Sequence, residues 1–409
     1  MVEDIAHALG ARQALSPAPP EPSAKRVSLA SGASGRILLF AYLDRVLPDA
    51  GWGDRAVEAI DQVIDDLAGM SADPSLYTGF TGVAWMLEHL QGWFLDEEDD
   101  PGEGIAAAVA RALRVPWRPF DLLQGLTGVG VWALERRPRP GADENLRRIV
   151  AGLAGMADRR GGTASWRTSP DLIPEDRRAW FPQGLAYTGI AHGAAGVISL
   201  LGEAQAVGLE CRPLLDHAVH WLLAQRLPPG RSSVFPAETA DEVAPGAPIP
   251  RPTRLAWCHG DPGIAAALLG AARRTGEPAW EREASALARA AAARSPAERS
   301  IVDASLCHGS AGLLHLFNRM YQATGDPALA EAARFWFDRT LELRRPGEDV
   351  AGFPAWDVGA DGKIAWQADP GFLTGAAGVG LALLAAATPI EPSWDRALLV
   401  SIPQEDSRP

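Results

Sequence analysis

The chain has 409 residues, of which 47% are hydrophobic and 22% charged, so it can bury a large core and is expected to be globular. Its formal net charge of −13 argues against nucleic acid as a partner, because binding a phosphate backbone requires a basic face. The sequence has neither an uninterrupted apolar run of about 18 residues nor a basic N-terminal stretch. A transmembrane segment and a signal peptide are therefore not expected, and a cytoplasmic location is the default.

A short phrase recurs seven times along the chain, and we call it the glycine phrase. It consists of one or two apolar residues, a Gly-x-x-Gly step and a further apolar run. The first glycines are 47, 46, 68, 67, 49 and 66 residues apart, at Gly32, Gly79, Gly125, Gly193, Gly260, Gly309 and Gly375. Every interval has room for two helices, and the three long intervals also have room for an insertion.

Two kinds of helix are predicted in alternation. After each glycine phrase, small apolar residues continue for about ten positions, which is typical of a helix buried on most of its circumference. Between the phrases, apolar residues recur at helical spacing, with charged residues on the opposite face. In chain order, the amphipathic helices are predicted over residues 2–15, 57–67, 104–113, 146–153, 212–226, 278–294 and 327–343.

Seven apolar and seven amphipathic helices predict an all-α protein, an α/α toroid with about seven inner and seven outer helices. An open solenoid needs polar caps, whereas the first and last phrases here are as apolar as the others, which favours a closed ring. We predict a single toroid domain over residues 1–390, with insertions near 136–178 and 228–252. Residues 391–409 are predicted to be a C-terminal tail.

The two positions before the first glycine distinguish three phrases from the other four. In four phrases these positions hold residues without obvious chemistry, whereas three consecutive phrases hold Ala191 and His192, Cys258 and His259, and Cys307 and His308. Equivalent positions in neighbouring repeats should project to the same end of a central cavity. Two thiols and three imidazoles are therefore expected to converge there.

Zinc is the metal that this donor set favours, since it accepts thiolate and imidazole ligands in tetrahedral geometry. Cys258, Cys307 and His308 would leave one position open for a substrate. A purely structural zinc site, with His192 or His259 as a fourth ligand, is the alternative. Taken singly, buried cysteines and histidines are more often ordinary core residues, so the prediction depends on their shared register. Cys211 lies outside the phrases and is interpreted as an ordinary thiol.

The phrases resemble those of the lanthionine synthetase C, or LanC-like, family. The resemblance spans roughly residues 28–385 and is carried by RLAWCHGDPG from Arg254, CHGSAG from Cys307, GIAHGAAG from Gly189 and the final LTGAAGVG. It implies a stand-alone, zinc-dependent lanthipeptide cyclase. Such an enzyme adds peptide cysteine thiolates to dehydroalanine or dehydrobutyrine and closes lanthionine or methyllanthionine rings.

The resemblance also implies the site residues. The zinc ligands would be Cys258, Cys307 and His308, and the catalytic residues His192, Asp121 and Arg254. His192 is expected to take the thiol proton or, as the less favoured role, to deliver a proton to the α-carbon. Asp121 would orient His192, and Arg254 would stabilise enolate charge; the alternatives are a helix cap for Asp121 and a surface ion pair for Arg254.

One position departs from the family pattern. His259 stands where many bacterial members have tyrosine, so its role stays open.

The resemblance also implies a substrate and partners. The substrate would be a dehydrated precursor peptide, and a lanthipeptide dehydratase and an export transporter are candidate partners. Two rival functions are a non-catalytic LanC-like zinc protein that binds a thiol such as glutathione or a protein partner, and an unrelated α/α toroid enzyme such as a glycoside hydrolase or a prenyltransferase subunit.

Overall fold

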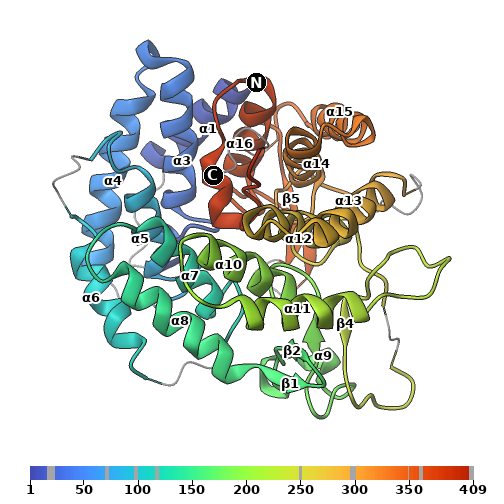
Figure 1. Cartoon of the computed structure of the whole chain (residues 1–409). Coiled ribbons are helices and arrows are strands. Elements are labelled where there is room, and N and C mark those ends of the chain that lie inside the picture. The colour runs from blue at the N-terminus through green and yellow to red at the C-terminus, as the bar shows by residue number, and fades with distance from the viewer. Residues whose placement is uncertain are drawn as a thin grey trace. The chain divides into compact units, whose positions relative to one another are not determined.

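The computed structural model describes residues 1–15, 24–69, 73–95, 100–115, 119–247, 251–294, 301–348, 350–358 and 363–404 (Figure 1). The described chain is mainly helical and divides into two compact units. The first unit comprises Met1–Val115, Ile301–Asn318 and Glu331–Ala397, and the second comprises Pro116–Ser300, Arg319–Ala330 and Leu398–Pro409. Each unit is described by itself.

Every glycine phrase is followed by a helix that begins directly after its first glycine. Nearly all residues of these helices are buried, as the uniformly apolar sequence predicts. The second glycine lets the start of the helix lie against its own phrase, since a Cβ on Gly263 would collide with the carbonyl oxygen of Trp257. The seven phrase helices within the described ranges are α3 (Ala33–Val46), α5 (Phe80–His89), α7 (Leu126–Glu135), α10 (Ala194–Ala206), α12 (Asp261–Thr275), α14 (Ser310–Thr324) and α16 (Ala376–Ala387).

The amphipathic helices also form where the sequence predicts them. Their ends differ from the predicted ends by a few residues, because helical spacing marks the buried face better than it marks the termini. The short helices α2 (Ala24–Val27) and α9 (Glu175–Arg178) and the 3₁₀ turns η1 (Pro48–Ala50) and η2 (Pro170–Leu172) were not predicted. The amphipathic helices are α1 (Val2–Leu15), α4 (Trp52–Ala68), α6 (Glu103–Ala112), α8 (Ala142–Met156), α11 (Arg212–Ala224), α13 (Pro278–Ala292) and α15 (Pro327–Glu342).

In the first unit, the first and last phrase helices lie side by side. Helix α16 packs against α1 and α3, and α3 also packs against α4 and α5 (Figure 1). Backbone hydrogen bonds join equivalent phrase positions, from the Cys307 N–H to the Leu373 carbonyl at 2.9 Å, from Leu373 to Ala30 at 3.0 Å and from Ala30 to Tyr77 at 2.9 Å. The first and last phrases are therefore direct neighbours, as the apolar character of both predicts.

The second unit repeats this arrangement with three phrases. Helix α10 packs between α7 and α12, and α8, α11 and α13 each pack on the phrase helix that precedes them. The Leu122 N–H donates to the Ala191 carbonyl at 3.1 Å, and the Ala191 N–H donates to the Cys258 carbonyl at 3.2 Å. The phrases that carry Asp121, His192 and Cys258 are thus held side by side through their backbones.

Three two-stranded antiparallel ladders lie in the long intervals between phrases, and the sequence did not predict them. β1 (Asp158–Arg160) pairs with β2 (Thr163–Ser165), and β3 (Ala186–Tyr187) pairs with β4 (Glu238–Thr239). In the first unit, β5 (Ala355–Val358) pairs with β6 (Ile364–Gln367). The segment 136–178, expected as an insertion, holds the amphipathic helix α8 as well as the β1–β2 hairpin, and the segment 228–252 holds β4.

The C-terminal segment needs a correction. Residues 393–398 form the 3₁₀ helix η4 (Ser393–Leu398), and the following residues to 402 are largely buried. The Tyr77 hydroxyl donates to the Ala397 carbonyl at 2.8 Å, and Trp257 Nε1 donates to the Leu398 carbonyl at 3.0 Å. The described part of 391–409 is therefore packed structure and not a tail, because its apolar residues find partners far away in sequence. None of the described helices is long and apolar enough to cross a membrane.

Candidate functional site

The pair of His192 and Asp121 is the centre of the candidate site. The backbone bond between their phrases brings the side chains together, with His192 Nδ1 2.6 Å from Asp121 Oδ2. Both remain accessible, since 34% of the His192 side chain and 16% of the Asp121 side chain are exposed. A carboxylate can only accept, so Nδ1 carries the proton of this bond and Nε2 is the ring atom left for chemistry. The structure therefore brings these two predicted site residues into contact, and their catalytic roles stay a prediction.

The other carboxylate oxygen of Asp121 forms a hydrogen bond within its own glycine phrase. Its Oδ1 accepts a hydrogen bond from the Gln124 backbone N–H at 2.9 Å, in the turn that leads into α7. One carboxylate oxygen thus fixes the turn while the other holds the histidine. The N-cap of α7 is Gly125 and receives no side-chain bond, so Asp121 is not the helix cap that the sequence left as an alternative.

Arg254 lies next to a thiol. Its Nη2 is 3.6 Å from the Cys258 Sγ, and Cys258 itself is buried. A neighbouring cation favours the thiolate over the thiol, which is the form that binds a metal. The sequence did not predict this contact, because the role expected for Arg254 was to stabilise the negative charge of an enolate. The arginine is exposed, so its guanidinium also borders the space in front of His192.

His259 packs between aromatic rings. Its ring stacks on that of His192, with centroids 5.4 Å apart and planes at 20°, and lies 5.1 Å from the Tyr187 ring. Burial lowers the pKa of His259 to about 4, so the ring is neutral at physiological pH. His259 therefore supports the position of His192 as an uncharged ring.

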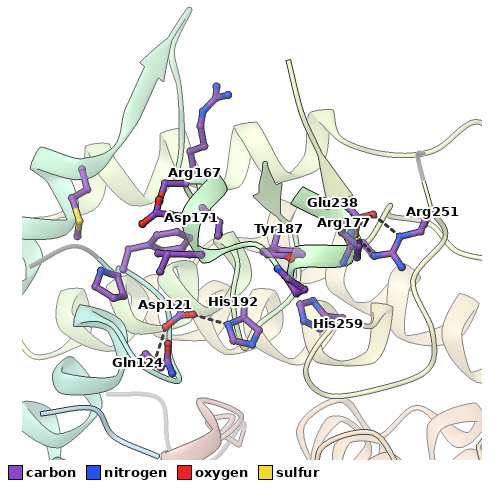
Figure 2. A pocket seen from close by; sticks show the side chains of 18 of the residues that line it. Asp121, Gln124, Arg167, Asp171, Arg177, Tyr187, His192, Glu238, Arg251 and His259 are labelled. Carbon is purple, nitrogen blue, oxygen red and sulfur yellow. Dashed lines mark hydrogen bonds and ion pairs between the residues drawn. The ribbon is translucent and has the colours of Figure 1, made fainter. Parts of the chain in front are cut away.

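A cavity of about 950 Å³ opens in front of these residues, and it is lined entirely by the second unit. Figure 2 shows the Asp121–His192 pair and His259 below Tyr187, with Arg177, Glu238 and Arg251 beyond them. The glycine phrases contribute Asp121, His192, His259 and the adjacent Arg254. The rest of the wall comes from the segments between phrases, which the sequence marked only as insertions.

We call the part of the lining that lies between the phrases, from Met156 to Tyr187 and from Ala237 to Pro252, the inserted wall. It contains an ion-pair cluster that the sequence did not predict. Glu238 is fully buried and accepts from Arg251 Nε at 2.6 Å and Nη2 at 2.8 Å, while Arg177 Nη2 lies 3.0 Å from its Oε1. Strand register places Tyr187 opposite Glu238. Burial raises the pKa of the Tyr187 phenol, so it stays protonated. The interval lengths of 68 and 67 residues were the only signal of this region.

Asp261 ties this wall to the phrase helices. It is the first residue of α12 and is buried, and it accepts from the backbone N–H groups of Val234 at 2.9 Å and Phe235 at 3.2 Å. Burial raises the pKa of this carboxyl. The segment that carries Glu238 and Arg251 is thus anchored three residues after Cys258.

The other two predicted metal ligands belong to the first unit. Cys307 and His308 stand directly before Gly309, with His308 Nε2 3.8 Å from Asp303 Oδ2. Asp303 is buried and held by the Ser305 N–H at 3.2 Å and the Trp356 N–H at 3.0 Å. Cys258 lies in the second unit, so the common ligand set of Cys258, Cys307 and His308 stays a prediction.

Comparisons with known proteins agree on one family. A family model described as lanthionine synthetase C-like protein matches residues 23–399. The nisin biosynthesis protein NisC of Lactococcus lactis subsp. lactis is 23% identical over 319 residues, which cover 72% of this chain and 74% of that protein. The structure of nisin cyclase superposes with a TM-score of 0.75 at 19% identity, over 98% of this chain and 96% of that chain.

The structural likeness to nisin cyclase shows the fold, and it confirms the predicted all-α toroid class. A cellobiose 2-epimerase from Bacillus thermoamylovorans B4167 covers 94% of this chain at 12% identity. Its TM-score of 0.47 is too low to bear on fold or function.

Proposed function

Because the chain belongs to the lanthionine synthetase C-like family, we propose that it is a zinc-dependent lanthipeptide cyclase. In this reaction the sulfur of a peptide cysteine bonds to the β-carbon of dehydroalanine or dehydrobutyrine, and the electrons of the double bond move toward the α-carbon and its carbonyl. A proton then adds to the α-carbon and a thioether ring results. The observation that carries the proposal is the His192–Asp121 pair at a cavity large enough for a peptide segment.

His192 is suited to remove the proton from the cysteine thiol. Its Nε2 is not part of the bond to Asp121, the residue lines the cavity, and the Asp121 carboxylate stabilises the imidazolium that forms. The imidazolium then carries the proton that the α-carbon needs, so the same ring can close the proton balance. We assign the first transfer to His192 and treat the second as the less favoured role.

The donor chemistry of the predicted ligands fits zinc. Two thiolates and one imidazole, from Cys258, Cys307 and His308, leave an open position, which is typical of catalytic zinc. Arg254 favours the Cys258 thiolate, and Asp303 lies near one ring nitrogen of His308, as a carboxylate does beside a ligating histidine. When bound, the metal would lower the pKa of the substrate thiol.

Arg254 has two tasks in this proposal. Its guanidinium lies beside the Cys258 sulfur, and it also lines the cavity. A fixed cation there stabilises negative charge that develops on the substrate carbonyl during addition. The substrate would be a dehydrated precursor peptide, a dehydratase and an export transporter would be partners, and the reaction would take place in the cytoplasm.

The test combines metal analysis with a thiol assay. We would measure zinc in the purified wild type and in Cys307→Ala, together with the loss of free thiol from a dehydrated, cysteine-containing peptide. We expect one zinc per wild-type chain, with zinc and thiol consumption both lost in the variant. Zinc without thiol consumption would favour a thiol-binding protein instead, and a wild type without zinc would overturn the proposed metal site.

A further inference from the structure

The two insertions of the second unit form one continuous wall. The Thr188 hydroxyl donates to the Pro236 carbonyl, and the Ala237 N–H donates to the Arg251 carbonyl at 2.8 Å. The Thr188 bond and the pairing of β3 with β4 join residues 186–188 to residues 236–239, which lie about fifty residues later in the sequence. These bonds join the backbone segments that carry the side chains of this wall.

Three charged residues of this wall form what we call the arginine clamp: Arg177, Glu238 and Arg251. Two guanidinium groups share one carboxylate, so the clamp carries a net charge of about +1. Glu238 is fully buried, whereas 40% of the Arg251 side chain is exposed and both arginines line the cavity. This positive charge faces the cavity of a chain whose formal net charge is −13.

The other charges of the cavity have partners of their own. Asp121 is paired with His192, and Arg254 contacts Cys258. Arg167 is paired with Asp241 at 2.7 Å and with Asp158 at 3.4 Å. Figure 2 shows Arg167 and Asp171 toward the opposite end of the pocket from the clamp. Among the described lining residues, Arg177 and Arg251 lie together and share the single carboxylate of Glu238.

The clamp lies one aromatic ring away from the catalytic histidine. The Tyr187 ring is 5.1 Å from His259 and 6.1 Å from His192, and Tyr187 is paired with Glu238 across the strands. A group held by the clamp would therefore lie within a few residues of a reacting cysteine. Guanidinium groups recognise carboxylates with paired, charge-assisted hydrogen bonds, and Arg177 Nε is buried without a hydrogen-bond partner among the described residues.

We propose that the arginine clamp binds a carboxylate of the peptide substrate and so orients the segment beside His192. The carboxylate would come from an Asp or Glu side chain or from the peptide C-terminus. This inference rests on the proposed function, since it assigns a substrate class to the same cavity. Peptides with an acidic group near the ring-closing cysteine would be preferred over neutral ones.

The test is a binding comparison with defined peptides. Short peptides carry one cysteine and a serine in place of the dehydro residue, so that they bind but cannot cyclise. Glu or Gln occupies each position around the cysteine in turn, and one Gln peptide ends in a free carboxylate instead of an amide. For at least one position, or for the free terminus, we expect the acidic peptide to bind wild type about five to ten times more tightly than its neutral partner.

Two substitutions of Arg251 and one control variant test whether the clamp causes the preference for acidic peptides. Arg251→Gln should abolish the preference for acid, and Arg251→Lys should retain part of it. Arg167→Gln is the matched control, because it removes a cavity-lining arginine that lies outside the clamp and is paired with Asp241, and it should keep the preference. Thermal unfolding confirms that each variant is folded. Equal binding of acidic and neutral peptides by the wild type, or a preference that survives in folded Arg251→Gln, would overturn the inference.

The same peptides with dehydroalanine separate this inference from the proposed function. If neutral peptides cyclise on wild type and no acidic peptide binds better, the clamp inference fails and the cyclase proposal stands. If acidic peptides bind through Arg251 and none of the dehydroalanine peptides loses its thiol, the cyclase proposal fails and the carboxylate site stands.

Discussion

The glycine phrases and the inserted wall of the second unit line the same cavity, but different interactions hold their side chains in place. The phrases position Asp121, His192 and Cys258 through backbone bonds between neighbouring phrases. The wall positions Arg177, Glu238 and Arg251 through side-chain ion pairs and a two-residue strand pairing. In the proposed cyclase, the repeat would position the reacting groups, and the insertion would determine which peptide is bound beside them. Variants of each region should affect different measurements.

The largest effect is expected from His192→Asn. The variant loses the base proposed for the thiol proton, and the neighbouring His259 ring, whose pKa burial lowers to about 4, is a poor substitute, so kcat for thiol addition should fall about 100- to 10,000-fold. The variant should bind the serine-containing peptides as the wild type does, because the clamp is unchanged. A folded variant that keeps more than a tenth of the wild-type kcat would show that His192 is not the base.

Asp121→Asn should have the next largest effect. The amide can still meet Nδ1 but cannot balance the charge of an imidazolium, so we expect kcat to fall about 10- to 100-fold. Asp171→Asn is a control, since it removes another carboxylate that lines the same cavity and leaves the Asp121–His192 bond in place. A loss of kcat of similar size in both variants would mean that the cavity responds to its total charge and not to the pair.

Gly263→Ala tests the repeat itself. The added methyl group would collide with the Trp257 carbonyl oxygen, which is backbone and cannot move aside, so we expect the free energy of unfolding to fall by about 1–3 kcal/mol. In Gly155→Ala, the new methyl group on α8 meets no neighbouring atom, and this control should gain up to about 1 kcal/mol. Chemical denaturation of both variants measures the difference. Equal stabilities would contradict the close approach.

The repeat was predictable because its information is local. Seven copies of one phrase predicted the helices, their order and the joint register of His192, Cys258 and Cys307, and none of this required knowledge of distant contacts. The arginine clamp was not predictable, because it depends on the pairing of Tyr187 with Glu238 across about fifty residues. The burial of the segment after Ser393 was missed for the same reason, since its partners, such as Tyr77 and Trp257, lie far away in the sequence.

The smallest effect is expected where the two regions join. Asp261 accepts two backbone N–H groups with its two oxygens, and in Asp261→Asn one of these donors would face an amide NH₂ instead. We expect a loss of about 1 kcal/mol in unfolding free energy, because one buried donor is left without a partner. Since the anchored segment carries Glu238 and Arg251, the preference for acidic peptides should weaken while kcat for neutral peptides stays close to that of the wild type. If kcat falls instead and the preference for acidic peptides is kept, Asp261 positions the residues of the repeat and not those of the wall. The proposed separation between catalysis by the repeat and peptide binding by the wall would then be wrong.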